Sequence, residues 1–163
     1  MIRLIQKSAM VKVVTTCALV ASSTLAVAEP GTSADELLGD AGRVLQQVDS
    51  DHYDDLWQNV APFVREKLTQ EQFVISIRRA RQTLGRVSSR GWASVTRIRY
   101  TNVTNFPDGL YANVDFATTL ASGATLFEML SFQLESDGQW RLTGYVPRQT
   151  QNAVSGTTQI ITP

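Results

Sequence analysis

Apolar residues recur at three- and four-residue spacing in three stretches of the first half of the chain, which is the period of an amphipathic helix. The first stretch covers Asp35–Val48 and the second covers Tyr53–Val60, after which Pro62 forces a break or a new start. The third opens at Thr69–Gln72, which has the form of a capping box, and Gly85 ends it. The pattern predicts two to three N-terminal helices.

After Gly85 the period changes to two, and β-branched and aromatic residues become frequent. The alternation predicts four strands, at Val87–Val103, Leu110–Leu120, Thr125–Glu135 and Gln139–Val146. Short turn sequences rich in Gly, Asp and Ser separate the last three strands from their predecessors, so neighbouring strands should pair antiparallel. Helices followed by such a meander predict an α+β fold, with the helices on one face of a four-stranded antiparallel sheet.

The first 28 residues have the anatomy of a secretory signal peptide. Arg3, Lys7 and Lys12 form a basic start, Val13–Val20 is an apolar run, and small residues precede a cleavage point after Ala28. The apolar run is short and interrupted by polar residues, so a stable membrane span is the weaker alternative. The pattern therefore predicts export, to the periplasm or the medium.

Cleavage would leave a mature chain from Glu29 to Pro163 with a net charge of −3, because it removes three of the 15 basic residues and none of the 15 acidic ones. Cleavage would also remove Cys17, so burial rather than disulfides must stabilise the mature fold. We expect one domain over residues 29–147 and a disordered, polar tail over 148–163.

Several classes of chemistry lack their motifs. The acidic run at residues 49–55 fails the EF-hand pattern, and His52 has no second histidine with which to share a metal ion. There is no nucleophile elbow, glycine-rich phosphate loop or paired metal-ligand spacing. We therefore expect no metal, no cofactor and, on balance, no enzyme. The negative mature charge also argues against nucleic acid as a partner.

Arginines are concentrated in the middle of the chain. Seven occur between Arg78 and Arg99 with no acidic residue among them, whereas eight of the 15 acidic residues lie in residues 29–55. One interpretation is a surface that binds an unknown protein or a small anionic ligand. The other is simple neutralisation between acidic and basic helices. The binding interpretation rests on Arg81, Arg90, Arg97 and Arg99.

Glu128 lies in the middle of the third predicted strand, on the apolar face expected under the helices. A buried carboxylate must be paired or neutralised, and Arg81 and Arg90 are the natural partners. A structural ion pair is the favoured interpretation. The alternative is a pocket acid that acts as a base, in which case Tyr145 would support it. Asp115 is a second candidate base, but its parity places it on the opposite face from Glu128.

An ordered series of short motifs runs through the chain: Asp49-x-x-x-Tyr53-x-x-x-Trp57, Arg81-x-x-Leu84-Gly85 followed by Arg90, Pro107-x-Gly109-x-Tyr111, Glu128, and Trp140-Arg141-x-x-Gly144-Tyr145. Over about residues 35–146 this series resembles the secreted bacterial domain-of-unknown-function family 4019. Phe73 departs from the pattern, which leads us to expect tryptophan there. The resemblance implies export and a cystatin-like or nuclear-transport-factor-like fold with a curved sheet, and it implies no activity. Within the motifs we expect structural roles for Trp57, Gly85, Glu128, Trp140, Gly144 and Tyr145.

Three functions remain open. The leading hypothesis is an exported, non-catalytic protein that binds a partner or ligand through its sheet or its arginine-rich edge. The second is a small-pocket enzyme or ligand carrier of the nuclear-transport-factor-like type, with Glu128 or Asp115 as base. The third is a structural homodimer formed through an exposed sheet face carrying Tyr111, Phe127 and Met129.

Overall fold

The structure is a computed structural model that describes residues 33–82 and 84–151. The predicted signal peptide, its cleavage point at Ala28 and residues 152–163 of the predicted tail lie outside the described residues. Within them the chain forms four helices and then four strands. The predicted α+β class is confirmed.

The helices begin where local signals place them. Helix α1 covers Ala34–Asp49, and the side chain of Ser33 accepts a hydrogen bond from the Glu36 amide at its start. Helix α2 covers Tyr53–Gln58, and α3 covers Pro62–Arg65, so Pro62 does begin a new helix. Helix α4 covers Gln70–Gln82.

The predicted capping box at the start of α4 is present. The Gln72 amide donates to Thr69 Oγ1 at 3.2 Å, and the Thr69 amide donates to Gln72 Oε1 at 2.9 Å. These two bonds satisfy amide groups that the first helical turn leaves without a partner. The helix ends at Gln82 rather than continuing to Gly85.

The strands form one antiparallel sheet in the order β1-β2-β3-β4, which is the predicted meander. They cover Val87–Tyr100 in β1, Gly109–Leu120 in β2, Thr125–Leu134 in β3 and Trp140–Arg148 in β4. The first strand therefore ends three residues earlier than predicted. The last strand runs two residues further than predicted and includes Arg148, which we had placed in the tail.

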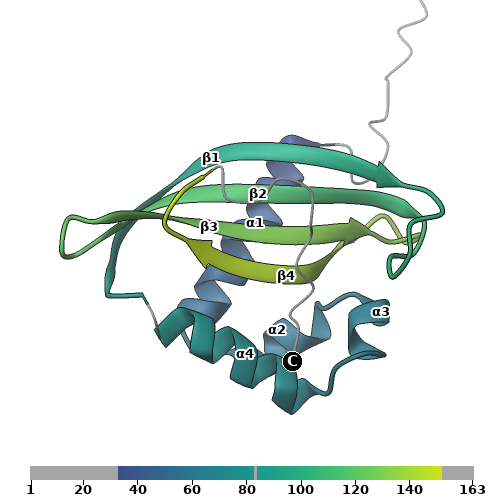
Figure 1. The fold of residues 1–163 in the computed structure, drawn as a ribbon, viewed down its shortest axis with the longest axis horizontal. Helices are drawn as coiled ribbons and strands as arrows, with labels where there is room; N and C mark the ends of the chain where they lie inside the picture. Colours follow the sequence, from purple (N-terminus) through teal and green to yellow (C-terminus); the bar gives the residue numbers. More distant parts are fainter. Residues whose placement is uncertain (1–32, 83, 152–163) are drawn as a thin grey trace, which may run out of the picture.

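Helix α1 crosses behind the sheet, and α2, α3 and α4 lie together next to β4 (Figure 1). The apolar stripe of α1 is buried against the sheet. Val60 forms a parallel bridge to Leu142, with the Ala61 amide donating to the Leu142 carbonyl and the Leu142 amide donating to the Asn59 carbonyl, both at 2.9 Å. The segment between α2 and α3 thus covers the outer edge of β4, whereas β1 forms the other edge of the sheet.

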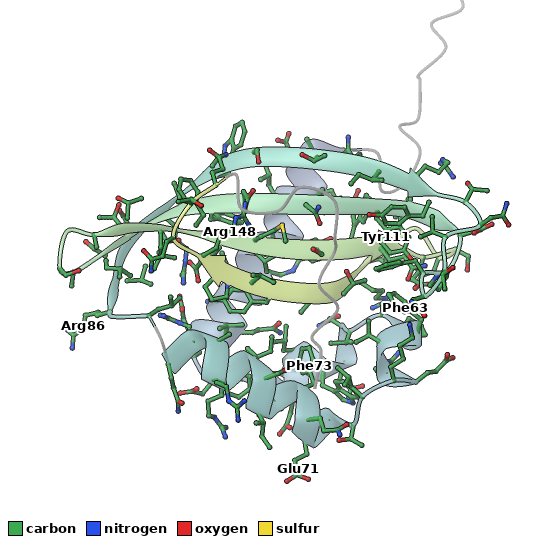
Figure 2. All side chains as sticks on the ribbon, viewed as in Figure 1. Phe63, Glu71, Phe73, Arg86, Tyr111 and Arg148 are labelled. Atoms are coloured by element: carbon green, nitrogen blue, oxygen red, sulfur yellow. The ribbon has the colours of Figure 1, made fainter. Side chains whose placement is uncertain are left out.

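The sheet face away from α1 is less open than predicted. Tyr111 is only 4% exposed and Met129 only 5%, and Phe127 is half-buried, so the expected exposed face at these residues is wrong. Tyr111 is buried because its ring packs against Phe63 and Tyr100 at one end of the sheet (Figure 2). Alternating polarity in a strand assigns a residue to a face, but it does not say how much of that face is covered.

Candidate functional site

One end of the sheet gathers charged and hydroxyl side chains from six different elements. We call this group the Glu128 cluster. It joins the last residue of α1, a residue near the end of α4 and one residue from each of the four strands. Its members are Asp49, Arg81, Arg90, Thr118, Glu128 and Tyr145.

Glu128 is at the centre of the cluster and is fully buried. Arg90 contacts both of its carboxylate oxygens, with Nε 2.6 Å from Oε2 and Nη2 3.3 Å from Oε1. Thr118 donates to Oε2 at 2.5 Å, and Tyr145 donates to Oε1 at 2.6 Å. The carboxylate therefore accepts four hydrogen bonds, which is its usual capacity. The structure buries Glu128 and pairs it with Arg90.

Asp49 joins the helices to this centre. Its carboxylate accepts from both terminal nitrogens of Arg90, with Nη2 at 3.0 Å from Oδ1, and also from Arg81, whose Nε lies 3.1 Å from Oδ1. Arg90 thus binds two carboxylates, one in the sheet and one at the end of α1. Arg81 holds the end of α4 against the same aspartate. The two arginines and two carboxylates balance in charge.

The cluster shifts the pKa values of Arg90 and Tyr145. Burial lowers the pKa of Arg90, but hydrogen bonds to Asp49 and Glu128 outweigh it and raise that pKa above its usual value. Burial, and then the charge and hydrogen bond of Glu128, raise the pKa of Tyr145. Arg90 therefore remains a cation and Tyr145 remains a hydrogen-bond donor at neutral pH.

This arrangement leaves no group free for catalysis at Glu128. A general base needs an oxygen that can reach the proton it abstracts, whereas both oxygens of Glu128 are occupied and none of its surface is exposed. Asp115 lies on the opposite face, where it pairs with Arg148 at 2.6 Å. The two candidate bases thus serve different faces, as their parity predicted.

Lowering the pH should weaken the cluster through Asp49. Burial raises the pKa of Asp49, but the hydrogen bonds and charges of Arg90 and Arg81 lower it by more. The pKa of Asp49 in the folded protein is therefore below its ordinary value. A lowered folded-state pKa adds stability above the unfolded-state value, and that stability is lost as the pH falls through the folded-state value. In urea titrations, we expect Asp49→Asn to be clearly less stable than the wild type at pH 7, and the difference to shrink as the pH falls below the ordinary pKa of an aspartate, about 3.9. A constant difference across this range would contradict the assignment.

The four arginines proposed for binding do not form one surface. Arg81 and Arg90 are engaged in the cluster, whereas Arg97 and Arg99 are exposed further along β1. Seven residues of extended strand separate Arg90 from Arg97, which is about 23 Å. The four arginines therefore lie in two separate pairs, because residues that are close in sequence along an extended strand can be far apart in space.

The residues expected to be structural have different environments. The ring centroids of Trp57 and Phe73 are 5.3 Å apart. Trp140 and Gly144 are buried in β4. Gly85 is exposed, and a Cβ there would make an ordinary 3.8 Å contact with Leu120, so packing does not require glycine at this position.

Sequence reasoning missed Thr118 and Arg148 and did not give Asp49 a role in the site. Asp49 is the first residue of the motifs that carry the family resemblance, and this could have marked it as a candidate site residue. Thr118 resembles any other strand threonine, and Arg148 lay in a segment that looked like a polar tail. Pairing across 33 residues to Asp115 is not visible in the local pattern of either residue.

Within residues 33–82 and 84–151, no group of three or more His, Cys, Asp or Glu side chains is arranged to hold a metal ion. No helix in the same ranges is long and apolar enough to cross a membrane.

The fold and the cluster define a small α+β domain in which a buried ion-pair network ties helices to an antiparallel meander. The sequence profile of a family described as a protein of unknown function, DUF4019, matches residues 40–145. Because this match covers more than half of the chain, the chain belongs to the DUF4019 family. No curated protein and no solved structure matches the chain. The resemblance inferred from the motifs is confirmed at the level of the family.

Proposed function

We propose that this protein is an exported binding domain whose β1 edge pairs with an acidic, extended segment of a partner protein. Export is supported by the basic start, the apolar run and the small residues that precede Glu29. The binding proposal rests on one observation. Strand β1 is 14 residues long and pairs with β2 on one side, and among the described residues no strand pairs with its other side. Such an edge can accept an added strand through main-chain hydrogen bonds.

The two edges of the sheet are treated differently by the fold. The Asn59–Ala61 segment hydrogen-bonds to Leu142 and covers the edge of β4. In β1 a register shift between Trp92 and Ser94 interrupts the ladder. A bulge makes the strand edge around it less able to pair with another strand. The segment that follows the irregularity, Ser94–Tyr100, is therefore the favoured place for a partner strand.

The side chains of β1 indicate the charge of the partner. The strand contains three arginines and no acidic residue, and Arg97 and Arg99 are exposed within the favoured segment. An acidic strand would face these charges, whereas a second copy of β1 would bring arginines towards arginines. Trp92 is 62% exposed next to this segment and offers an aromatic contact at its margin.

A peptide titration tests this proposal. The probe is a peptide of about twelve alternating threonine and glutamate residues, and its matched control carries lysine in place of glutamate. We expect the acidic peptide alone to shift the backbone amide NMR signals of Ser94–Tyr100. Reversing both charges, in Arg97→Glu with Arg99→Glu, should weaken binding by roughly tenfold, which corresponds to about 1.4 kcal/mol for two exposed charge pairs.

Arg79→Glu is the control variant, because Arg79 is exposed on α4 and lies outside β1. It should bind the acidic peptide as the wild type does. Equal binding of the two peptides would contradict a charge-selective edge. Shifts confined to other strands would place the binding surface elsewhere, and a dimer in the absence of peptide would assign the edge to a second copy of the chain.

The nuclear-transport-factor-like carrier and the homodimer remain predictions that no observation on this chain favours over the edge proposal. The first, a small-pocket enzyme or ligand carrier, would place its pocket around Glu128, whose carboxylate is buried and fully hydrogen-bonded. The second would need an open apolar surface, and two of the three residues expected to mark it are buried.

A further inference from the structure

A second binding site is suggested by a cavity beside the middle and C-terminal part of α1. This cavity has a volume of about 150 Å³ and lies between α1, the residue that follows α2, and the start of β4. Asp40 on α1 and Trp140 on β4 both line it. None of its lining residues belongs to the Glu128 cluster or to β1. The cavity is therefore separate from the cluster and from the β1 edge.

The lining combines an apolar base with polar groups of both charges. Leu142 and Phe132 form part of it and are 0% and 1% exposed. Arg43 and Arg141 bring two cations. Asp40, which also lines the cavity, pairs with Arg43, and Asp137, which does not line it, pairs with Arg141 at 2.9 Å. A few placed polar groups around a buried apolar base are typical of small-molecule sites.

Trp140 supplies a second, independent observation. Trp140 is one of the lining residues and is 5% exposed, and its indole N–H has no hydrogen-bond partner among the described residues. A buried donor without a partner costs free energy, so such a group calls for an acceptor. A ligand with carboxylate oxygens in the cavity would provide one.

The charges and the volume narrow the class of ligand. Two of the lining side chains are arginines and one is an aspartate, so the lining favours a ligand with carboxylates, one of which would share Arg141 with the half-exposed Asp137. Asp40 favours a ligand that also carries an ammonium group. Burial raises the pKa of Asp40, although Arg43 beside it acts in the opposite direction. An ammonium group would favour the charged form of Asp40. A cavity of this volume holds on the order of ten water-sized groups, so the ligand has about ten non-hydrogen atoms.

We propose that this cavity binds a small acidic α-amino acid, with its carboxylates towards Arg43 and Arg141 and its ammonium group towards Asp40. This site is independent of the proposed function of the β1 edge. Each can be present without the other, because they share no residue.

The test is a titration of the isotopically labelled full chain with L-glutamate, followed by the indole N–H signal of Trp140. The chain has three tryptophans, and Trp140→Phe identifies the signal. We expect a saturable shift with a dissociation constant in the millimolar range or tighter. Glutarate, which lacks the ammonium group, and 4-aminobutyrate, which lacks the α-carboxylate, should each bind at least about tenfold more weakly, because each loses a charged hydrogen bond.

Two variants connect the shift to the cavity. Arg141→Gln and Asp40→Asn should each weaken L-glutamate binding by about tenfold or more, since each removes one proposed partner. Arg79→Gln is the matched control, because Arg79 is an exposed arginine that does not line the cavity. Thermal melting of each variant separates lost binding from lost folding.

The proposal is overturned if the indole signal does not move, or if it moves equally in all the variants. If glutarate bound as tightly as L-glutamate, the amino-acid assignment would be overturned, because the ammonium group and its proposed partner Asp40 would contribute nothing to binding. Charge reversal at Arg97 and Arg99 should not affect this titration, so failure of one site is distinguishable from failure of the other.

Discussion

Replacing Glu128 with alanine should lower the free energy of unfolding by about 3–5 kcal/mol, the cost typical of removing one partner from a buried ion pair. The change leaves Arg90 with Asp49 alone, and it leaves the hydroxyl groups of Thr118 and Tyr145 without their acceptor. These groups are buried, so water cannot easily replace the lost carboxylate. Urea unfolding at pH 7 measures the effect.

Glu66→Ala is the matched control for this prediction. Glu66 is exposed at the end of α3, and its removal should change the free energy of unfolding by no more than about 0.5 kcal/mol. A double-mutant cycle with Arg90→Ala separates the pair interaction from the rest of the cluster. A loss below about 1 kcal/mol for Glu128→Ala would show that the cluster contributes little to folding.

Replacing Phe73 with alanine should destabilise the fold by a similar amount, about 3–5 kcal/mol, but through packing rather than charge. Phe73 is 1% exposed and packs its ring against Trp57 at 5.3 Å. It points from α4 into the protein, whereas Glu71 on the same helix points away (Figure 2). Removing the ring would leave a cavity that the helices cannot fully close. Thermal or urea unfolding measures the loss.

Ile75→Ala provides the comparison on the same helix. Ile75 is 48% exposed, so its truncation should cost no more than about 0.5 kcal/mol. Equal losses for the two variants would mean that α4 is not anchored through Phe73. Phe73 is also the position at which the family pattern leads us to expect tryptophan, so Phe73→Trp tests whether the packing of α4 against Trp57 accepts a larger ring.

The parts of the fold that follow from short-range chemistry were predictable from the sequence. Pro62 began a new helix, and Thr69 and Gln72 formed the predicted capping box. Strand alternation placed Glu128 and Asp115 on opposite faces of the sheet. In each case the cause lies within a few residues, because backbone dihedral angles, end caps and side-chain parity are set locally.

The candidate site was predictable only in part. The need to pair a buried Glu128 pointed to Arg81 and Arg90, and Arg90 does bind it. Arg81 binds Asp49 instead, and the contact between Arg90 and Asp49 spans 41 residues of sequence. The local sequences around Arg81 and Arg90 do not show which of the two carboxylates, Asp49 or Glu128, each arginine will contact.

By itself, the sequence determined the order of helices and strands, the antiparallel meander and the face on which each strand residue lies. The tertiary structure decided which charges meet and which faces are covered. It brought the ends of α1 and α4 to one end of the sheet, so that Asp49 and Arg81 join Glu128 there. It also buried Tyr111 and Met129 on a face that alternation alone left open. The reason is physical: periodicity acts over a few residues, whereas burial and ion pairing depend on how whole elements pack.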